Sequence, residues 1–224
     1  VAFHEKRDLL PQAISFVGPP GTGKGTRANY LATMMGGVPV LKLGNVSSGG
    51  LRGKKEDRYR AAIEAAKRLA PCVLCIDELE KIFPNTEKTG NKSNDDDEVI
   101  AYLQSEIGSK GMKGIVLIGT CNKPDELDTA MLRNGRFGLC VAVLPPQTLD
   151  EKLDLFAAVK SQFESLNEVE IPLDLIMKIL EMDNLRGTAG NDYYELLRLA
   201  ALKWHLSAGG DFIEALKEMA VLFR

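Results

Sequence analysis

The sequence shows no long apolar run, no signal-peptide pattern and no strong net charge of either sign. No apolar stretch in its 224 residues is long enough to cross a bilayer, and no signal-peptide pattern opens it. Its net charge of −3 gives no overall attraction to nucleic acid. With 45% hydrophobic residues, we expect a globular chain with one main domain and a small appendage. Because it begins at Val1 and not Met, we expect a piece of a longer protein.

Cysteine is scarce, and its spacing is the only hint of redox or zinc chemistry. Cys72 and Cys75 form a C-x-x-C pair inside an apolar run, where a strand would point them to opposite faces. Cys121 and Cys140 also lie in or beside apolar runs. We therefore expect buried, reduced cysteines, with a redox or zinc site as the alternative.

A glycine-rich string follows the apolar run 13–17 and precedes a helical pattern. Glycines let backbone N–H groups turn toward phosphates, and the helix N-terminus adds positive potential. Lys24 at the helix start is placed to reach the terminal phosphate oxygens, which a simple turn would not need. The predicted phosphate-binding residues are Gly18, Pro19, Pro20, Gly21, Thr22, Gly23, Lys24, Gly25 and Thr26.

One position departs from the usual phosphate loop. The residue after the lysine is normally Ser or Thr, whose hydroxyl binds Mg²⁺, but here it is Gly25. Thr26 carries the next hydroxyl, yet successive helical residues point about 100° apart, so it cannot simply take the vacant place. A water can fill that position on Mg²⁺. Thr26 and Asp77 are the candidate metal ligands, and we expect ATP and Mg²⁺ as cofactors.

Apolar runs alternate with helical patterns up to Pro145-Pro146, and only helical patterns follow. We expect strands at 13–17, 38–43, 72–76, 115–118 and 139–144, and helices at 24–35, 54–70, 96–108 and 126–133. Later helices are expected at 149–164, 173–183, 191–207 and 210–222. The fold class is therefore α/β, a parallel sheet with helices on both faces. We expect a nucleotide-binding domain at 1–146 and a helical lid at 147–224.

Polar residues follow two of the expected strands. The run 72–76 ends in Asp77 and Glu78, which in a parallel sheet face the same crevice as the phosphate loop. Asp77 would hold the Mg²⁺ shell and Glu78 would polarise the attacking water. Asn122 follows the next strand, where its amide is placed to bind the γ-phosphate and that water. A helix cap and a turn residue are the plainer alternatives for these positions.

Two arginines, Arg133 and Arg136, stand three apart after the expected helix 126–133. Residues at this spacing share one face, and planar guanidinium groups suit the bridging of phosphate charge. Solvated surface charges are the alternative. An arginine finger contributes about 10³–10⁵ in rate, often from a neighbouring molecule.

Together these strings resemble the AAA ATPases, the narrow clade within AAA+, over nearly the whole chain. GPPGTGKG looks like Walker A, VLCIDE like Walker B, and TCNKPDELDTAMLRNGRF like the second region of homology. The resemblance implies that Asn122 is the sensor-1 residue and that Arg133 and Arg136 are arginine fingers acting on the adjacent subunit. It also places Gly190 and Asn191 at the start of the lid helix that touches the nucleotide.

The family implies a homo-oligomeric ring, usually a hexamer, that remodels a protein client through its pore. The pore segment here is Ser48–Glu56, with Leu51 in the aromatic place and Arg52, Lys54 and Lys55 after it. In a ring, the pore segments of all copies would lie around one axis and concentrate these positive charges. Such a pore favours a client with an acidic polypeptide tail. The alternative is a charged helix face. GGLRGKKE with APCVLCIDELEK also resembles the Ycf46-like AAA proteins of plastids and bacteria.

Three other functions stay open at this point. GKGT also occurs in adenylate kinase-like phosphotransferases, although these have no use for residues 120–137. A nucleic-acid-handling AAA+ protein would bind DNA or RNA with steep salt dependence, a partner we do not expect here. A nucleotide-gated assembly module would bind ATP and hydrolyse it very slowly. We expect a cytoplasmic protein, or one of the plastid stroma if the source is eukaryotic.

Overall fold

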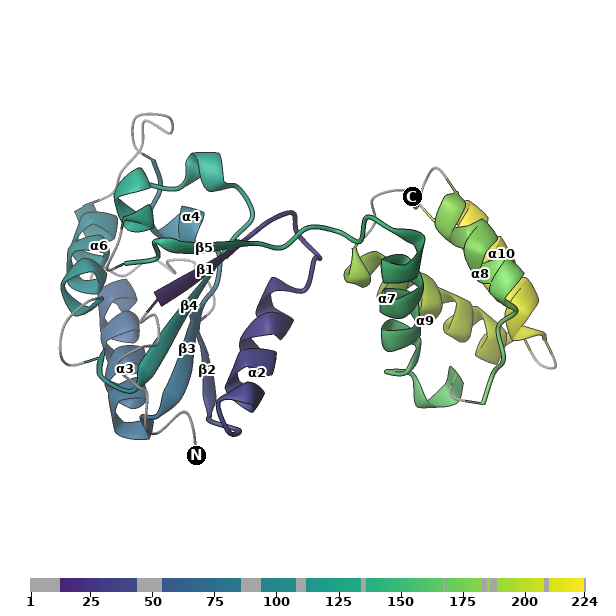
Figure 1. Cartoon of the computed structure of the whole chain (residues 1–224), viewed down its shortest axis with the longest axis horizontal. Coiled ribbons are helices and arrows are strands. Elements are labelled where there is room, and N and C mark those ends of the chain that lie inside the picture. The colour runs from purple at the N-terminus through teal and green to yellow at the C-terminus, as the bar shows by residue number, and fades with distance from the viewer. Residues whose placement is uncertain are drawn as a thin grey trace. The chain divides into compact units, whose positions relative to one another are not determined.

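The computed structural model describes residues 13–43, 54–85, 94–107, 112–133, 136–166, 168–182, 185, 189–207 and 210–223 (Figure 1). The chain divides into two compact units. Unit 1 comprises Val1–Pro19 and Lys24–Val143, and unit 2 comprises Pro20–Gly23 and Leu144–Arg224. The predicted domain bounds, 1–146 and 147–224, stay a prediction. The pore segment 48–56 lies outside the described side chains.

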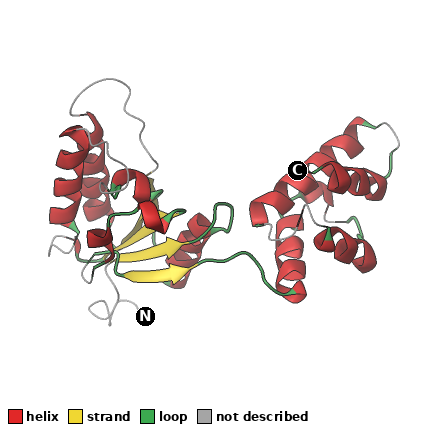
Figure 2. Ribbon diagram, turned by 90° about the horizontal axis from the view of Figure 1, so that it is seen from above, coloured by secondary structure: helices red, strands yellow, loops and turns green. Residues whose placement is uncertain are grey.

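A parallel sheet forms the centre of unit 1 (Figure 2). It has five strands in the order β2-β3-β4-β1-β5. Its strands are β1 (Ala13–Val17), β2 (Val40–Leu43), β3 (Cys72–Ile76), β4 (Ile115–Cys121) and β5 (Leu139–Ala142). All five begin within two residues of their predicted starts. The sheet confirms the predicted α/β class. Because β4 lies between β3 and β1 and all three run in the same direction, the loops that follow them lie side by side at the carboxyl ends of the strands. We call this side of the sheet the carboxyl edge, or simply the edge.

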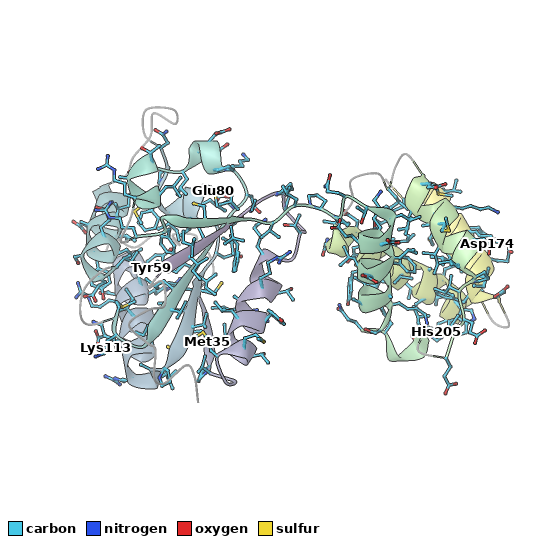
Figure 3. The ribbon with its side chains drawn as sticks, in the orientation of Figure 1. Met35, Tyr59, Glu80, Lys113, Asp174 and His205 are labelled. Atoms are coloured by element: carbon cyan, nitrogen blue, oxygen red, sulfur yellow. The ribbon has the colours of Figure 1, made fainter. Side chains whose placement is uncertain are left out.

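Helices cover both faces of this sheet, so β1, β3 and β4 are apolar on both faces. Side chains alternate along β3: Leu74 packs in the core under α3 (Lys54–Leu69), α4 (Leu79–Ile82) and α6 (Asn94–Glu106). Val73 packs in the core under α2 (Lys24–Met34). Figure 3 shows Tyr59 of the first core and Met35 of the second on opposite faces of the sheet.

One local prediction is wrong, and one short helix was not predicted. Residues 126–133 do not form one helix but two short 3₁₀ helices, η3 (Pro124–Glu126) and η4 (Thr129–Leu132). Leu127 between them is extended and forms a β-bridge with Pro84, a long-range pairing that the local pattern cannot show. Helix α4 has four residues and follows β3 almost directly, so it is too short to produce a periodic pattern.

The described part of unit 2 is helical. It contains α7 (Leu149–Lys160), the 3₁₀ helix η5 (Glu164–Leu166), α8 (Leu173–Glu181), α9 (Gly190–Leu206) and α10 (Phe212–Leu222). Phe156 and Tyr193 lie edge to face in its core, with ring centroids 5.9 Å apart. Thr148 begins α7 with a capping box completed by Glu151. No described helix has the length and apolar character that a membrane crossing requires.

Gly119 of β4 allows α4 to pack directly on the sheet. A Cβ atom at this position would lie 2.2 Å from Leu79 Cδ1 and 2.8 Å from Leu79 Cγ. Real Cβ atoms do not approach other atoms so closely, so any larger residue would force the Leu79 side chain to move.

We predict that Gly119→Ala lowers the free energy of unfolding by about 1–3 kcal/mol, because overpacking forces Leu79 and α4 to move. Urea denaturation measures this change. Gly25→Ala is the matched control: its Cβ would meet nothing within 4 Å, and alanine in a helix should raise stability by up to about 1 kcal/mol. Equal effects of the two substitutions would contradict the prediction.

Candidate functional site

The glycine-rich loop connects β1 to α2, as predicted. Gly21 and Gly23 have φ angles of 77° and 80°, which glycine adopts without strain. The Gly18 N–H donates to the Cys121 carbonyl at 3.1 Å, which joins the loop to the end of β4. The loop thus stands beside the strand end that carries Asn122.

Lys24 is buried at the first position of α2. Its Nζ donates to the carbonyl oxygens of Gly18 at 2.8 Å and Pro19 at 2.6 Å. An ammonium group has three donors, so it can keep these bonds and also reach a phosphate oxygen. Burial lowers the pKa of Lys24 below 10.5, whereas Glu80 and then Asp77 act to raise it.

Gly25 and Thr26 occupy the next two positions of α2. The space around Gly25 is open, since a Cβ atom there would meet no other atom within 4 Å. Thr26 is exposed. Nothing in this arrangement moves the Thr26 hydroxyl into the place that Gly25 leaves open, so its role as a metal ligand stays a prediction.

Asp77 and Glu78 follow β3, and a single hydroxyl connects them to β4. Thr120 Oγ1 donates a hydrogen bond to Asp77 Oδ1 and accepts one from the Glu78 N–H at 3.1 Å. Thr120 is fully buried, whereas the Asp77 residue is exposed. Asp77 therefore keeps a carboxylate in solvent while one of its oxygens is fixed to the sheet.

Glu78 adopts a left-handed conformation, with φ 56° and ψ 60°. It is the one non-glycine residue with positive φ in the described part of the chain. A glutamate in this region is strained by about 1–3 kcal/mol, and such strain concentrates at functional sites. Its carboxylate forms an ion pair with Lys81 at 2.6 Å.

Glu80 is a buried carboxylate that sequence reasoning missed. Figure 3 shows it on α4, and its Oε1 accepts the Asn122 N–H at 3.1 Å. Among the described residues, its Oε2 is buried with no hydrogen-bond partner. Asn122 directly follows β4, as predicted, and its side chain is half-buried.

Arg133 and Arg136 follow η4 and differ in their surroundings. Arg133 is exposed, whereas Arg136 is half-buried and its Nη1 donates to the Ala130 carbonyl at 3.1 Å. Neither arginine has an ion pair to a carboxylate within the described ranges. Their role as arginine fingers stays a prediction.

In unit 2, Gly190 and Asn191 begin α9, close to the predicted start at 191. Asp192 accepts the Ala189 N–H at 2.8 Å and closes this end of the helix.

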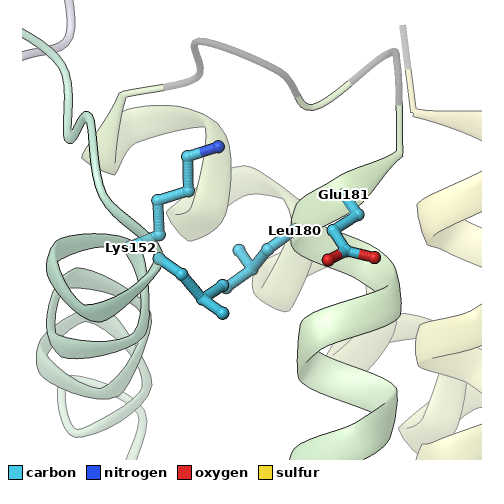
Figure 4. A pocket seen from close by; sticks show the side chains of 4 residues that line it. Lys152, Leu180 and Glu181 are labelled. Atoms are coloured by element: carbon cyan, nitrogen blue, oxygen red, sulfur yellow. The ribbon is translucent and has the colours of Figure 1, made fainter.

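A pocket of about 390 Å³ lies between α7 and α8, lined by Leu149, Lys152, Leu180 and Glu181 (Figure 4). None of the predicted site residues lines this pocket.

The cysteines are free thiols. Cys72 and Cys75 belong to cores on opposite faces of the sheet, as predicted, so they cannot pair. Burial raises the pKa of Cys75 to about 11 and, with the nearby Glu80 carboxylate, that of Cys121 to about 12. The expectation of burial is wrong for Cys140, which is exposed on the edge strand β5. No cluster of metal-binding side chains occurs within the described ranges.

The residues at this edge suit a magnesium nucleotide. The loop N–H groups and Lys24 are donors for phosphate oxygens, and Asp77 supplies an exposed oxygen of the kind that Mg²⁺ prefers. Glu78 beside it offers a carboxylate that can orient a water. Thr120 was visible in the sequence as a polar residue at the end of an apolar run, on the same alternating face as Asp77. Glu80 gave no signal.

Comparison with known proteins gives one family. Residues 14–143 match the model of the "ATPase family associated with various cellular activities (AAA)". Protein SAV of Sulfolobus acidocaldarius is 31% identical over 194 residues, covering 86% of this chain and 24% of that protein. The peroxisomal ATPase PEX6 of Saccharomyces cerevisiae is 30% identical over 197 residues, covering 84% and 18%. PEX6 of Arthrobotrys oligospora is 30% identical over 215 residues, covering 92% and 17%. The chain thus spans about a quarter or less of these relatives.

Proposed function

This chain belongs to the AAA family of ATPases, and from that premise we propose that it binds ATP with Mg²⁺ and hydrolyses it in a site completed by a second copy. We further propose that a homo-oligomeric ring, a hexamer, uses this hydrolysis to remodel or thread a protein client. The observation that carries the proposal is the meeting of Lys24, Asp77 and Glu78 at one sheet edge.

The proposed roles follow from the position of each group. The loop 18–26 and Lys24 hold the phosphates, and Asp77 holds the metal, with Thr26 as a further candidate ligand. Mg²⁺, when bound, neutralises charge on the phosphate oxygens. Glu78 orients and deprotonates the attacking water, and Asn122 fixes that water against the terminal phosphate. Gly190 and Asn191 are proposed nucleotide contacts from the lid.

The arginines support a shared site. Arg133 and Arg136 have no carboxylate partner among the described residues, and guanidinium groups suit the charge of a phosphoryl transition state. We propose that both act on ATP held by the adjacent copy. Arg133 is the more accessible of the two because Arg136 is partly held by the Ala130 carbonyl.

The client proposal rests on the family and on the pore segment. Two relatives are named as peroxisomal ATPases, whereas the cationic segment 48–56 favours an acidic polypeptide tail here. The Ycf46-like placement and the cytoplasmic location stay predictions. A second candidate is an assembly module with very slow hydrolysis, which the absence of a hydroxyl at Gly25 favours.

We predict that Glu78→Gln lowers ATP turnover at least a hundredfold while ATP binding persists, because the amide cannot accept the proton of the attacking water. Phosphate release measures turnover, and native mass measurement with and without ATP reports assembly. Glu214→Gln is the matched control, since Glu214 also pairs with a lysine three residues later, at 2.7 Å. A parent protein that loses no turnover in Glu78→Gln would be a pure assembly module.

We predict that Arg133→Ala alone has almost no turnover but keeps ATP affinity, because the finger contacts the transition state on a neighbour. Mixing the Arg133→Ala and Glu78→Gln variants should restore part of the activity. In the mixture, a Glu78→Gln protomer supplies its Arg133 to the site of a neighbouring Arg133→Ala protomer, whose Glu78 is still present. Arg198→Ala removes an exposed arginine paired with Glu195 and should change nothing. Failure of the mixture to recover would place the arginine and its site on one chain.

We predict that Gly25→Thr lowers the Mg²⁺ concentration needed for half-maximal turnover by roughly tenfold, the scale of other changes around a bound metal. The open space at Gly25 accommodates the side chain, and its hydroxyl replaces a water on the metal. A Mg²⁺ titration of turnover measures the shift. Gly25→Ala adds the Cβ atom without the hydroxyl, and an equal shift in that variant would exclude metal coordination as the cause.

A further inference from the structure

We propose that Thr120 and Glu80 are positioning residues that fix Glu78, Asp77 and Asn122 by two reciprocal hydrogen-bonded links between β3 and β4. This inference rests on the proposed function, because the groups they position are the proposed water-activating and metal-binding groups. Neither Thr120 nor Glu80 is assigned a role by the motifs described above.

The register of β3 and β4 brings Thr120 to Asp77. Ile76 pairs with Gly119, so the next positions, Asp77 and Thr120, stand side by side. Ile118 packs in the core under α2, and alternation along β4 therefore turns Thr120 to the α2 face. Lys24 begins α2, so Thr120 lies on the face of the sheet that carries the phosphate loop.

The Thr120 hydroxyl uses both of its functions at once. It donates to Asp77 Oδ1 and accepts the Glu78 N–H at 3.1 Å. The first bond fixes the rotation of the Asp77 carboxylate. The second supports a backbone conformation that glutamate adopts only at a cost, whereas the Glu78 carboxylate itself is paired with Lys81 at 2.6 Å.

Glu80 forms the return link from β3 to β4. Its Oε1 accepts the Asn122 N–H at 3.1 Å, and the residue is 6% exposed. Burying a carboxylate is costly, and one that packs a helix against a sheet could be replaced by an apolar residue at lower cost. The hydrogen bond that Glu80 accepts from the Asn122 N–H therefore indicates that the buried carboxylate serves to position Asn122.

Backbone amide exchange tests these links without nucleotide. In a nitrogen-15 NMR experiment, the Glu78 N–H should be protected in the parent and in Thr120→Ser, and should exchange at least tenfold faster in Thr120→Val. Likewise the Asn122 N–H should lose protection in Glu80→Ala and keep it in Glu80→Gln, whose carbonyl can still accept. Unchanged Glu78 protection in Thr120→Val would overturn the proposal.

Kinetics then separates positioning from stability. Thr120→Val should lower kcat roughly 10–100-fold, as other changes to groups that orient site residues do, with ATP affinity within threefold of the parent. Thr120→Ser, which keeps the hydroxyl, should restore most of kcat. Ile118→Val is the control: it removes a buried methyl group from the same strand, and should lower the denaturation midpoint without lowering kcat.

The outcomes distinguish this inference from the proposed function. A parent without ATP turnover would remove both. An active parent whose Thr120→Val variant is equally active would remove only the positioning role, as would an equal loss of kcat in Ile118→Val and Thr120→Val.

Discussion

The shared edge at which β1, β3 and β4 end is the constraint on which the candidate site depends. Three parallel strands in neighbouring positions bring their following loops together, whatever those loops contain. Each loop then contributes a different chemical group: an ammonium after β1, two carboxylates after β3 and an amide after β4. Each of these strands is packed by apolar cores on both faces of the sheet.

Two buried side chains hold polar groups at this edge by hydrogen bonds. Thr120 and Glu80 are both buried, and each forms a hydrogen bond to the loop after the neighbouring strand. In a low-dielectric interior such bonds are stronger than in water, and an unmet polar atom is costly. The unpartnered Oε2 of Glu80 and the strained backbone of Glu78 each lower the stability of the fold, and both occur within four residues after β3. These residues are therefore retained at a cost in stability.

Much of this arrangement was predictable because it follows from local pattern. Apolar runs located the strands, the parallel sheet placed Asp77, Glu78 and Asn122 near Lys24, and alternation separated Cys72 from Cys75. The predictions that were wrong, and the residue that was missed, depend on contacts with residues distant in the sequence. The Leu127–Pro84 bridge divided an expected helix, and the edge position of β5 left Cys140 exposed. Glu80 could not be found, because its burial depends on how closely α4 approaches Gly119.

The sulfur of Cys121 lies immediately before Asn122, so the site would be open to oxidative damage if this thiol ionised readily. Oxidants such as peroxide attack the thiolate and not the thiol. With its pKa raised to about 12, Cys121 remains a thiol at neutral pH. Burial beside a carboxylate thus makes this sulfur chemically inert, and peroxide would reach the exposed Cys140 long before it altered the residues around the phosphate loop.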